Sequence, residues 1–440
     1  MLTVIGIVLF ALVIMLSIAL HEVGHLVPAK RFGVKVTEYM IGFGPMVWSR
    51  RRGETDYGVK AIPLGGYIRM IGMLPPPKDA PPGTARAATT GRMALLVEEA
   101  RRQSLEEVAP GDENRVFYKL PVRKRIVIML GGPLMNLLLA FVLFAGVLVG
   151  IGLPEPTLQV TAVTACTPTS ANPSADATEA GGCPAGSQPS PASAAGIQPG
   201  DTIVSIDGRE FTSWDEMTAW VRAAGAVPVT IVLDRGGSQV TTETTLATAE
   251  RPVTDETGRP TGETESVSYL GVRPEIAYVS QPWSAVPQQM WDLTTASVKA
   301  LVSLPVRLYE LLTDTLIGGG ERQIDGPVSV VGVSRLGGEI AALDEPIEAK
   351  AATFLGLAAS LNLFLFLFNL LPVLPLDGGH VAGALWEGTR RRLAKWRGKP
   401  DPGPVDLARL MPVAYGVAAV LIGMSLIVIW ADLVKPITLG

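Results

Sequence analysis

Histidine is scarce in this chain. Only three histidines occur among 440 residues, and all three lie in two short stretches. Residues 21–25 read His-Glu-Val-Gly-His, and residues 376–380 read Leu-Asp-Gly-Gly-His. Both stretches lie within or beside long apolar runs, so no histidine is left for an ordinary solvated surface. The histidines therefore indicate a specialised site.

Charged residues are also few. They make up 18% of the chain against 48% hydrophobic residues, a balance that excludes a protein built from soluble domains alone. The net charge is only −4 and no basic stripe with interleaved aromatic residues occurs, so nucleic acid is not an expected partner. The first residues lack the basic segment of a signal peptide, and no cleavage site follows the apolar run. We therefore expect a retained first span.

The two cysteines, Cys166 and Cys183, do not have the Cys-x₂-Cys spacing of a zinc knuckle. Both lie in one stretch rich in Pro, Ser, Ala and Gly. In an oxidising compartment, a disulfide between them would close a loop of about 17 residues and contribute about 3 kcal/mol. Two free thiols are the alternative.

Four apolar segments are long enough to cross a bilayer, which takes a helix of about 20 residues. If the four spans alternate in direction, the basic clusters between them fall on one side, and the positive-inside rule makes that side cytoplasmic. Both termini and the region from about 153 to 350 then lie outside. The segments are residues 4–27, 126–150, 353–374 and 411–430.

Composition divides the rest of the chain into regions. Alternating apolar residues between Gly and Pro predict a hairpin of short strands after the first span. Turns, strands and one helix alternate over residues 194–235, which predicts a small α+β domain. The expected boundaries are 1–28 for the first span, 29–74 for a membrane-associated β region, 75–122 for a cytoplasmic insertion, 123–152 for the second span, 153–280 for the α+β domain with its Cys-containing loop, 281–350 for interfacial amphipathic helices, 351–380 for the third span, 381–408 for a basic cytoplasmic loop and 409–432 for the fourth span.

Residues 21–25 predict a metal site. On a helix, His21 and His25 lie four residues apart on one face, so both can bind one Zn²⁺ while Glu22 takes a proton from the metal's water. The alternative is a helix with two histidines and no metal. A carboxylate and two imidazoles at the end of an apolar span would be costly without a partner, and this cost favours zinc.

A catalytic zinc site needs three protein ligands and one open position. Asp377 is the candidate third ligand, because it follows an apolar run that two prolines break. Irregular backbone at membrane depth is tolerated where it packs against protein or lines a cavity. A helix cap at the cytoplasmic boundary is the alternative role. His380 could be a fourth ligand, a hydrogen-bond partner or an interfacial residue; we favour a role other than ligand, because a fourth protein ligand would close the site to water.

Together these motifs resemble the motif set of the site-2 proteases, a family of intramembrane zinc metalloproteases. The resemblance covers most of the chain in the same order. Residues 194–208 are similar to the start of a PDZ domain in bacterial members that cleave anti-sigma factors. The matching motifs are residues 21–25, Gly-Phe-Gly at 42–44, Gly-Gly-Pro-Leu-Met-Asn at 131–136, and 369–378.

The resemblance implies a polytopic α-helical protein of the plasma membrane. Its four transmembrane helices would be joined by a membrane-associated β-hairpin region and one extracytoplasmic α+β PDZ-like domain. The site residues that it implies are His21, His25 and Asp377 as zinc ligands, Glu22 as the catalytic acid/base, and Asn369, Asn136, Gly42 and Gly44 as residues that position substrate.

The activity implied is hydrolysis of peptide bonds within the membrane-spanning segments of single-span proteins. An upstream site-1 protease would first trim these substrates, which are anti-sigma factors and signal-peptide remnants, and the lipid bilayer is a further partner. The glycine-rich strands near residues 42–66 would hold an unwound substrate by strand addition, or would only cover the site. The PDZ-like domain would act as a size filter or as a peptide anchor.

Two other functions compete with this one. A catalytically silent PDZ-bearing membrane scaffold would not need Glu22 beside intact metal ligands. Zinc transporters usually show repeated halves with corresponding polar interruptions, and the sequence has no such repeat. Both observations favour the protease.

Overall fold

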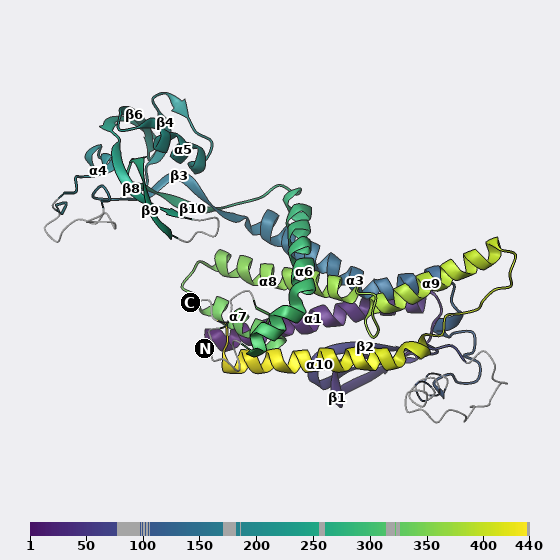
Figure 1. Ribbon diagram of the computed structural model, residues 1–440. Coiled ribbons are helices and arrows are strands. Elements are labelled where there is room, and N and C mark those ends of the chain that lie inside the picture. The colour runs from purple at the N-terminus through teal and green to yellow at the C-terminus, as the bar shows by residue number, and fades with distance from the viewer. Residues whose placement is uncertain are drawn as a thin grey trace. The chain divides into compact units, whose positions relative to one another are not determined.

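The computed structural model divides the chain into two compact units (Figure 1). Unit 1 comprises Met1–Ile151 and Gln281–Gly440, and unit 2 comprises Gly152–Ser280. Much of the expected insertion at 75–122 lies outside the described residues. The structure describes residues 1–76, 97, 99, 102, 104, 106–169, 182–184, 186–254, 260–313, 322 and 326–437.

Within the described residues, four helices, all in unit 1, are long and apolar enough to cross a membrane, as the sequence predicts. The first of them leaves Leu9, Leu12 and Leu16 at least half exposed. Such exposure is unfavourable in water but not in hydrocarbon. The four helices are α1 (Leu2–Arg31), α3 (Val122–Ala145) with its π-helical continuation η2 (Gly146–Ile151), α8 (Ile347–Asn369), and α10 (Met411–Val434) preceded by η4 (Leu407–Leu410).

Helices α1, α3 and α8 run side by side in unit 1 (Figure 1). Between α1 and α3 the contact is made by glycines: a Cβ on Gly24 or on Gly131 would collide with the backbone of the other helix. In lipid, helices associate through close packing and not through hydrophobic burial, so small residues at the contact are favourable. Gly6 of α1 meets Gly337 and Gly338 of α7 (Val330–Ala342) in the same way.

The chain does not continue as one helix through the Leu-Asp-Gly motif. Helix α8 ends at Asn369, and a new helix, α9 (Asp377–Trp396), begins at the aspartate. The two prolines between them lack the N–H groups that a continuous helix requires. The third span therefore ends earlier than the expected 351–380, and the first half of the expected basic loop, 381–408, is helical.

The segment after α1 forms a sheet of two strands, β1 (Val36–Arg52) and β2 (Thr55–Met70). These strands are longer than the short strands expected. Both bend in the middle, so that Met40 pairs with Tyr67 on one side and with Gly58 on the other. Within the described residues, the second half of β2 has a pairing partner on one side only and so forms an edge.

Unit 1 also contains η1 (Phe117–Lys119) and the long helix α6 (Ala285–Glu310). Helix α6 exposes Trp291, Val302 and Tyr309. A helix with this apolar surface is typical of one that meets lipid or another protein.

Unit 2 is an α+β domain around one sheet. Its strands follow the order β10-β3-β4-β6-β7, with β5 beside β4, while β8 and β9 form a separate pair. Cys166 and Cys183 form a disulfide. The elements are β3 (Leu153–Val163), α4 (Pro191–Ala194), β4 (Thr202–Ile206), β5 (Arg209–Glu210), α5 (Trp214–Ala224), β6 (Pro228–Arg235), β7 (Ser238–Thr245), β8 (Ala247–Thr254), β9 (Pro260–Tyr269) and β10 (Val272–Val279).

An ion pair fixes the turn that precedes β4. The Asp201 side chain is buried, and its carboxylate accepts hydrogen bonds of 2.7 Å from Arg235 Nε and Nη2 and of 2.8 Å from the Gln198 N–H. The Arg235 guanidinium holds the pKa of the Asp201 carboxyl below its usual range. A depressed pKa contributes stability above the unfolded pKa of about 3.9, and this contribution is lost as the pH falls below that value.

We expect Asp201→Asn to lower the free energy of unfolding of unit 2 by about 2 kcal/mol, because Arg235 loses its charged acceptor. Protease susceptibility of unit 2 in the detergent-solubilised full chain, followed against temperature, would measure the loss. The difference between variant and parent should shrink below about pH 3.9. The exposed Asp215 on α5 provides the control: Asp215→Asn should leave unfolding unchanged. Equal losses in both variants would contradict the prediction.

Candidate metal centre

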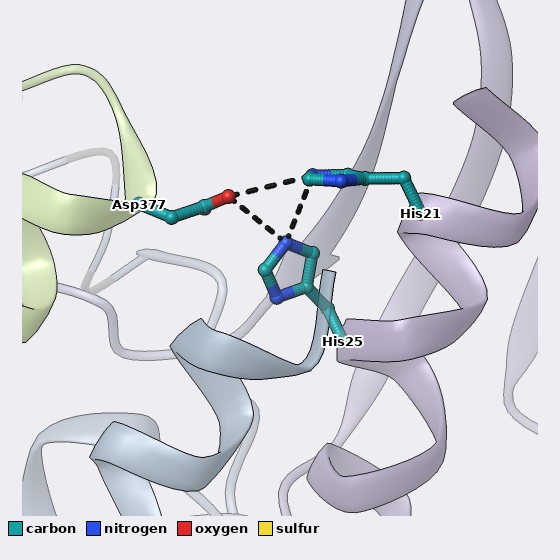
Figure 2. A group of neighbouring side chains, drawn as sticks. All are labelled: His21, His25 and Asp377. Carbon is teal, nitrogen blue, oxygen red and sulfur yellow. Dashed lines mark hydrogen bonds and ion pairs between the residues drawn. The ribbon is translucent and has the colours of Figure 1, made fainter. Parts of the chain in front are cut away.

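Two histidines of α1 and the first residue of α9 converge on one point (Figure 2). His21 Nε2 and His25 Nε2 lie 3.2 Å apart. Asp377 Oδ2 lies 3.4 Å from the first and 3.3 Å from the second. Ligands held tetrahedrally about 2.0–2.1 Å from zinc are separated by about 3.3 Å. The three atoms therefore fit three corners of a zinc site and could hold the ion.

Local structure explains how each side chain reaches this point. His21 and His25 are one helical turn apart, so they project from the same face of α1. Asp377 begins α9, where unpaired backbone N–H groups favour a negative side chain. Gly379 lets the chain before α9 fold back closely, because a Cβ there would lie 2.6 Å from Leu374 N.

The space for an ion is left by a glycine of α3. A Cβ on Gly132 would lie 2.7 Å from His21 Nε2 and would collide with His25 Nε2. Glycine at this position therefore leaves room beside both ligand nitrogens. This gap, next to three convergent donor atoms, is the second observation that fits a metal.

The tautomer of His25 is fixed by α3. His25 Nδ1 donates a hydrogen bond of 2.7 Å to the Ile128 carbonyl. A carbonyl can only accept, so the proton of the neutral ring lies on Nδ1 and Nε2 keeps its lone pair. A metal ligand needs this tautomer.

Glu22 lies beside the cluster and against the sheet. It is buried and interacts electrostatically with all three cluster residues, and the backbone of Ile68 in β2 lies close to its carboxylate. A Cβ on Gly66 would lie 3.1 Å from Glu22 Cγ, so β2 approaches closely here. Tyr39 donates a hydrogen bond of 2.8 Å to the Ala19 carbonyl and fastens β1 to α1.

The four residues expected to position substrate have different surroundings. Asn136 is buried beside His21. Asn369 ends α8, and within the described residues no hydrogen bond joins it to the cluster. Gly42 and Gly44 have φ angles of +90° and +83°, which by itself explains why glycine stands there. A role of these four residues toward substrate stays a prediction.

His380 follows Asp377 by one turn of α9 but is not among the convergent donor atoms of the described residues. Its buried Nδ1 has no hydrogen-bond partner in this part of the chain. Sequence reasoning assigned no role to Gly132, Ile128 or Ile68. For Gly132 the sequence does contain a signal, two adjacent glycines before a proline in an apolar span. Ile128 and Ile68 act through their main chain, and a main-chain contact does not depend on the residue type.

Comparisons with known proteins agree with this geometry. The family described as Peptidase family M50 matches residues 9–400. The chain is 37% identical over 450 residues to zinc metalloprotease Rip1 of Mycobacterium bovis (strain BCG / Pasteur 1173P2), with 100% of both chains covered. It is 36% identical over 446 residues to Rip1 of Mycolicibacterium smegmatis (99% and 98% covered) and 26% identical over 476 residues to zinc metalloprotease RasP of Shouchella clausii (97% and 98% covered).

We expect Gly132→Ala to lower zinc affinity on the order of 10- to 100-fold, because the new methyl group displaces both imidazoles. Zinc content of the purified protein after dialysis against a chelator would measure the loss. Gly146→Ala in η2 is the matched control, since a Cβ there meets nothing within 4 Å. Equal zinc retention in the two variants would show that the gap at Gly132 is not needed.

Proposed function

The chain belongs to peptidase family M50, the site-2 proteases, and is a zinc metalloprotease of the membrane; on this premise we propose that it hydrolyses peptide bonds within the membrane-spanning segments of single-span proteins. One observation carries the proposal: two imidazole nitrogens and a carboxylate oxygen converge beside a buried glutamate on an apolar helix. The substrates we propose are proteins already trimmed outside by an upstream protease, such as anti-sigma factors and signal-peptide remnants.

In this proposal His21, His25 and Asp377 bind zinc, and Glu22 is the catalytic acid/base. Zinc held by these residues would lower the pKa of a water molecule and would polarise the scissile carbonyl. Glu22 accepts the proton of the attacking water and passes it to the leaving amine. The close approach of Gly66, where a Cβ would lie 3.1 Å from Glu22 Cγ, restricts the Glu22 side chain during these transfers.

We place the site near the cytoplasmic boundary of the membrane. Helix α1 has 30 residues and a length of about 45 Å, which exceeds the hydrocarbon thickness of about 30 Å. The two histidines of the cluster lie in the second half of this helix, toward Lys30 and Arg31 at its end. The positive-inside rule favours a cytoplasmic location for such an end. Unit 2 and both termini then lie outside, where the disulfide of unit 2 would be stable.

The edge of β2 is the proposed place for an unwound substrate. In a strand, the N–H groups of alternate residues point to the same side. The second half of β2 pairs with β1 on one side only within the described residues, and Gly66 brings this part of β2 close to Glu22. A substrate strand added there would lie beside Glu22 in an extended form, with the carbonyls that a helix keeps occupied now accessible.

We expect Glu22→Gln to retain zinc and to lose cleavage on the order of 10²- to 10⁴-fold, because glutamine cannot take the proton. The assay is cleavage of a single-span substrate with a truncated outer domain in reconstituted membranes, with the cut located by mass spectrometry. Glu348→Gln changes an exposed glutamate at the start of α8 and should keep both properties.

Cleavage by both parent and Glu22→Gln would remove Glu22 from the mechanism. Zinc binding by the parent without cleavage of any substrate in a panel would favour the silent scaffold.

Strand addition makes a separate prediction about the substrate. Proline introduced at successive positions beside the cut should reduce kcat/KM at every second position, because only alternate N–H groups would face β2. Alanine at the same positions is the control. A period of three to four residues, or a uniform effect, would contradict strand addition and leave the protease assignment untouched.

A further inference from the structure

Each histidine of the cluster has a second ring nitrogen, and α3 bonds to both of these nitrogens. For His25 the partner is the Ile128 carbonyl, which leaves only one tautomer. For His21 the partner is the Asn136 carboxamide, whose Nδ2 lies 3.1 Å from His21 Nδ1. An amide offers a donor and an acceptor of nearly equal size, so this contact alone permits either tautomer of His21.

The orientation that the structure assigns to the amide conflicts with a metal ligand. If Asn136 Nδ2 donates to His21 Nδ1, the proton of the neutral ring must lie on Nε2. That atom faces His25 and Asp377. Either orientation leaves one of the two amide heavy atoms buried without a hydrogen-bond partner in the described part of the chain, so the requirement that His21 Nε2 be free for a metal decides between them.

We propose that Asn136 is a positioning residue for His21, whose Nδ1–H donates to the Asn136 amide oxygen and whose Nε2 is thereby kept free for the metal. Rotating the Asn136 amide group by about 180° exchanges the positions of Oδ1 and Nδ2 without moving α3. This inference rests on the proposed zinc ligands. It goes beyond them by giving Asn136 a role toward a ligand in place of the expected role toward substrate.

The spacing of contacts along α3 supports this arrangement. Ile128, Gly132 and Asn136 are separated by four residues each, so they lie on one stripe of the helix. On that stripe, the Ile128 carbonyl accepts from His25, Gly132 leaves the gap beside both histidine Nε2 atoms, and Asn136 contacts His21. The same face of α3 thus supports the whole histidine pair, and an acceptor at each end would give both rings the same tautomer.

The test is the zinc affinity of substituted proteins. It is measured by competition with a chelator of known affinity. Asn136→Leu removes the acceptor and should lower zinc affinity on the order of 10- to 100-fold. Asn136→Asp keeps an oxygen acceptor but has no N–H, so it should bind zinc like the parent. The control is Asn362→Leu, which removes a fully buried amide of α8 that bonds to Ser17 and the Ala358 carbonyl; it should leave zinc affinity unchanged.

The outcomes separate the proposals. Unchanged zinc affinity in Asn136→Leu, together with lower activity, would overturn the inference and would favour a role of Asn136 in positioning substrate. If both Asn136→Leu and Asn136→Asp lose zinc while Asn362→Leu retains it, the assignment of the Asn136 side-chain oxygen as the acceptor for His21 Nδ1–H would be overturned. A parent protein that binds no zinc would overturn the ligand set itself.

A second measurement needs no variant. The chain has only three histidines, so nitrogen-15 labelling of histidine gives three sets of imidazole signals. In the zinc-loaded protein, we expect His21 and His25 to show the same tautomer, with the proton on Nδ1. A proton on Nε2 of one of these two rings would contradict the inference.

Discussion

The close approach of α1 and α3 at Gly24 and Gly131 is the contact on which the site depends. With no side chains between the two backbones, the Ile128 carbonyl reaches His25 and the Asn136 side chain reaches His21. In lipid no hydrophobic force drives these two helices together. Their association therefore depends on close van der Waals packing between the glycine-lined surfaces of α1 and α3. A larger residue at this contact would move α3 away and would cost both histidines their partners.

Helix α3 also holds the element that carries the carboxylate. Arg125, near its start, forms a buried ion pair with Glu387 of α9. Glu387 also accepts a hydrogen bond of 3.0 Å from the Val405 N–H and forms an ion pair with Arg391, at 3.1 Å between Arg391 Nη2 and Glu387 Oε1. A buried carboxylate shared among several donors is costly to displace, so it fixes the position of α9 on α3. One helix thus orients both groups that supply the proposed ligands.

Much of this arrangement could be predicted from the sequence, because its signals are local. Apolar runs of about 20 residues give the spans, and a spacing of four residues puts His21 and His25 on one face. The Leu-Asp-Gly motif, which follows an apolar run broken by two prolines, identified Asp377 as the candidate third ligand. The length of α9 and the two-sided pairing of β1 could not be predicted, because they depend on contacts with distant residues. Asn136 shows the same limit: its motif pointed to substrate, whereas its neighbour in the structure is a ring nitrogen of His21.

The proposed ligands are separated by a long stretch of chain. Asp377 follows His25 by 352 positions, and α9 can form only after three of the four apolar helices have been synthesised. A ribosome making this protein therefore inserts α1, with both histidines and Glu22, into a membrane long before the carboxylate exists. Until then the nascent chain lacks one of the three proposed zinc ligands. On the proposed ligand set, the metal site is therefore completed only after three of the four apolar helices of the described residues have been made.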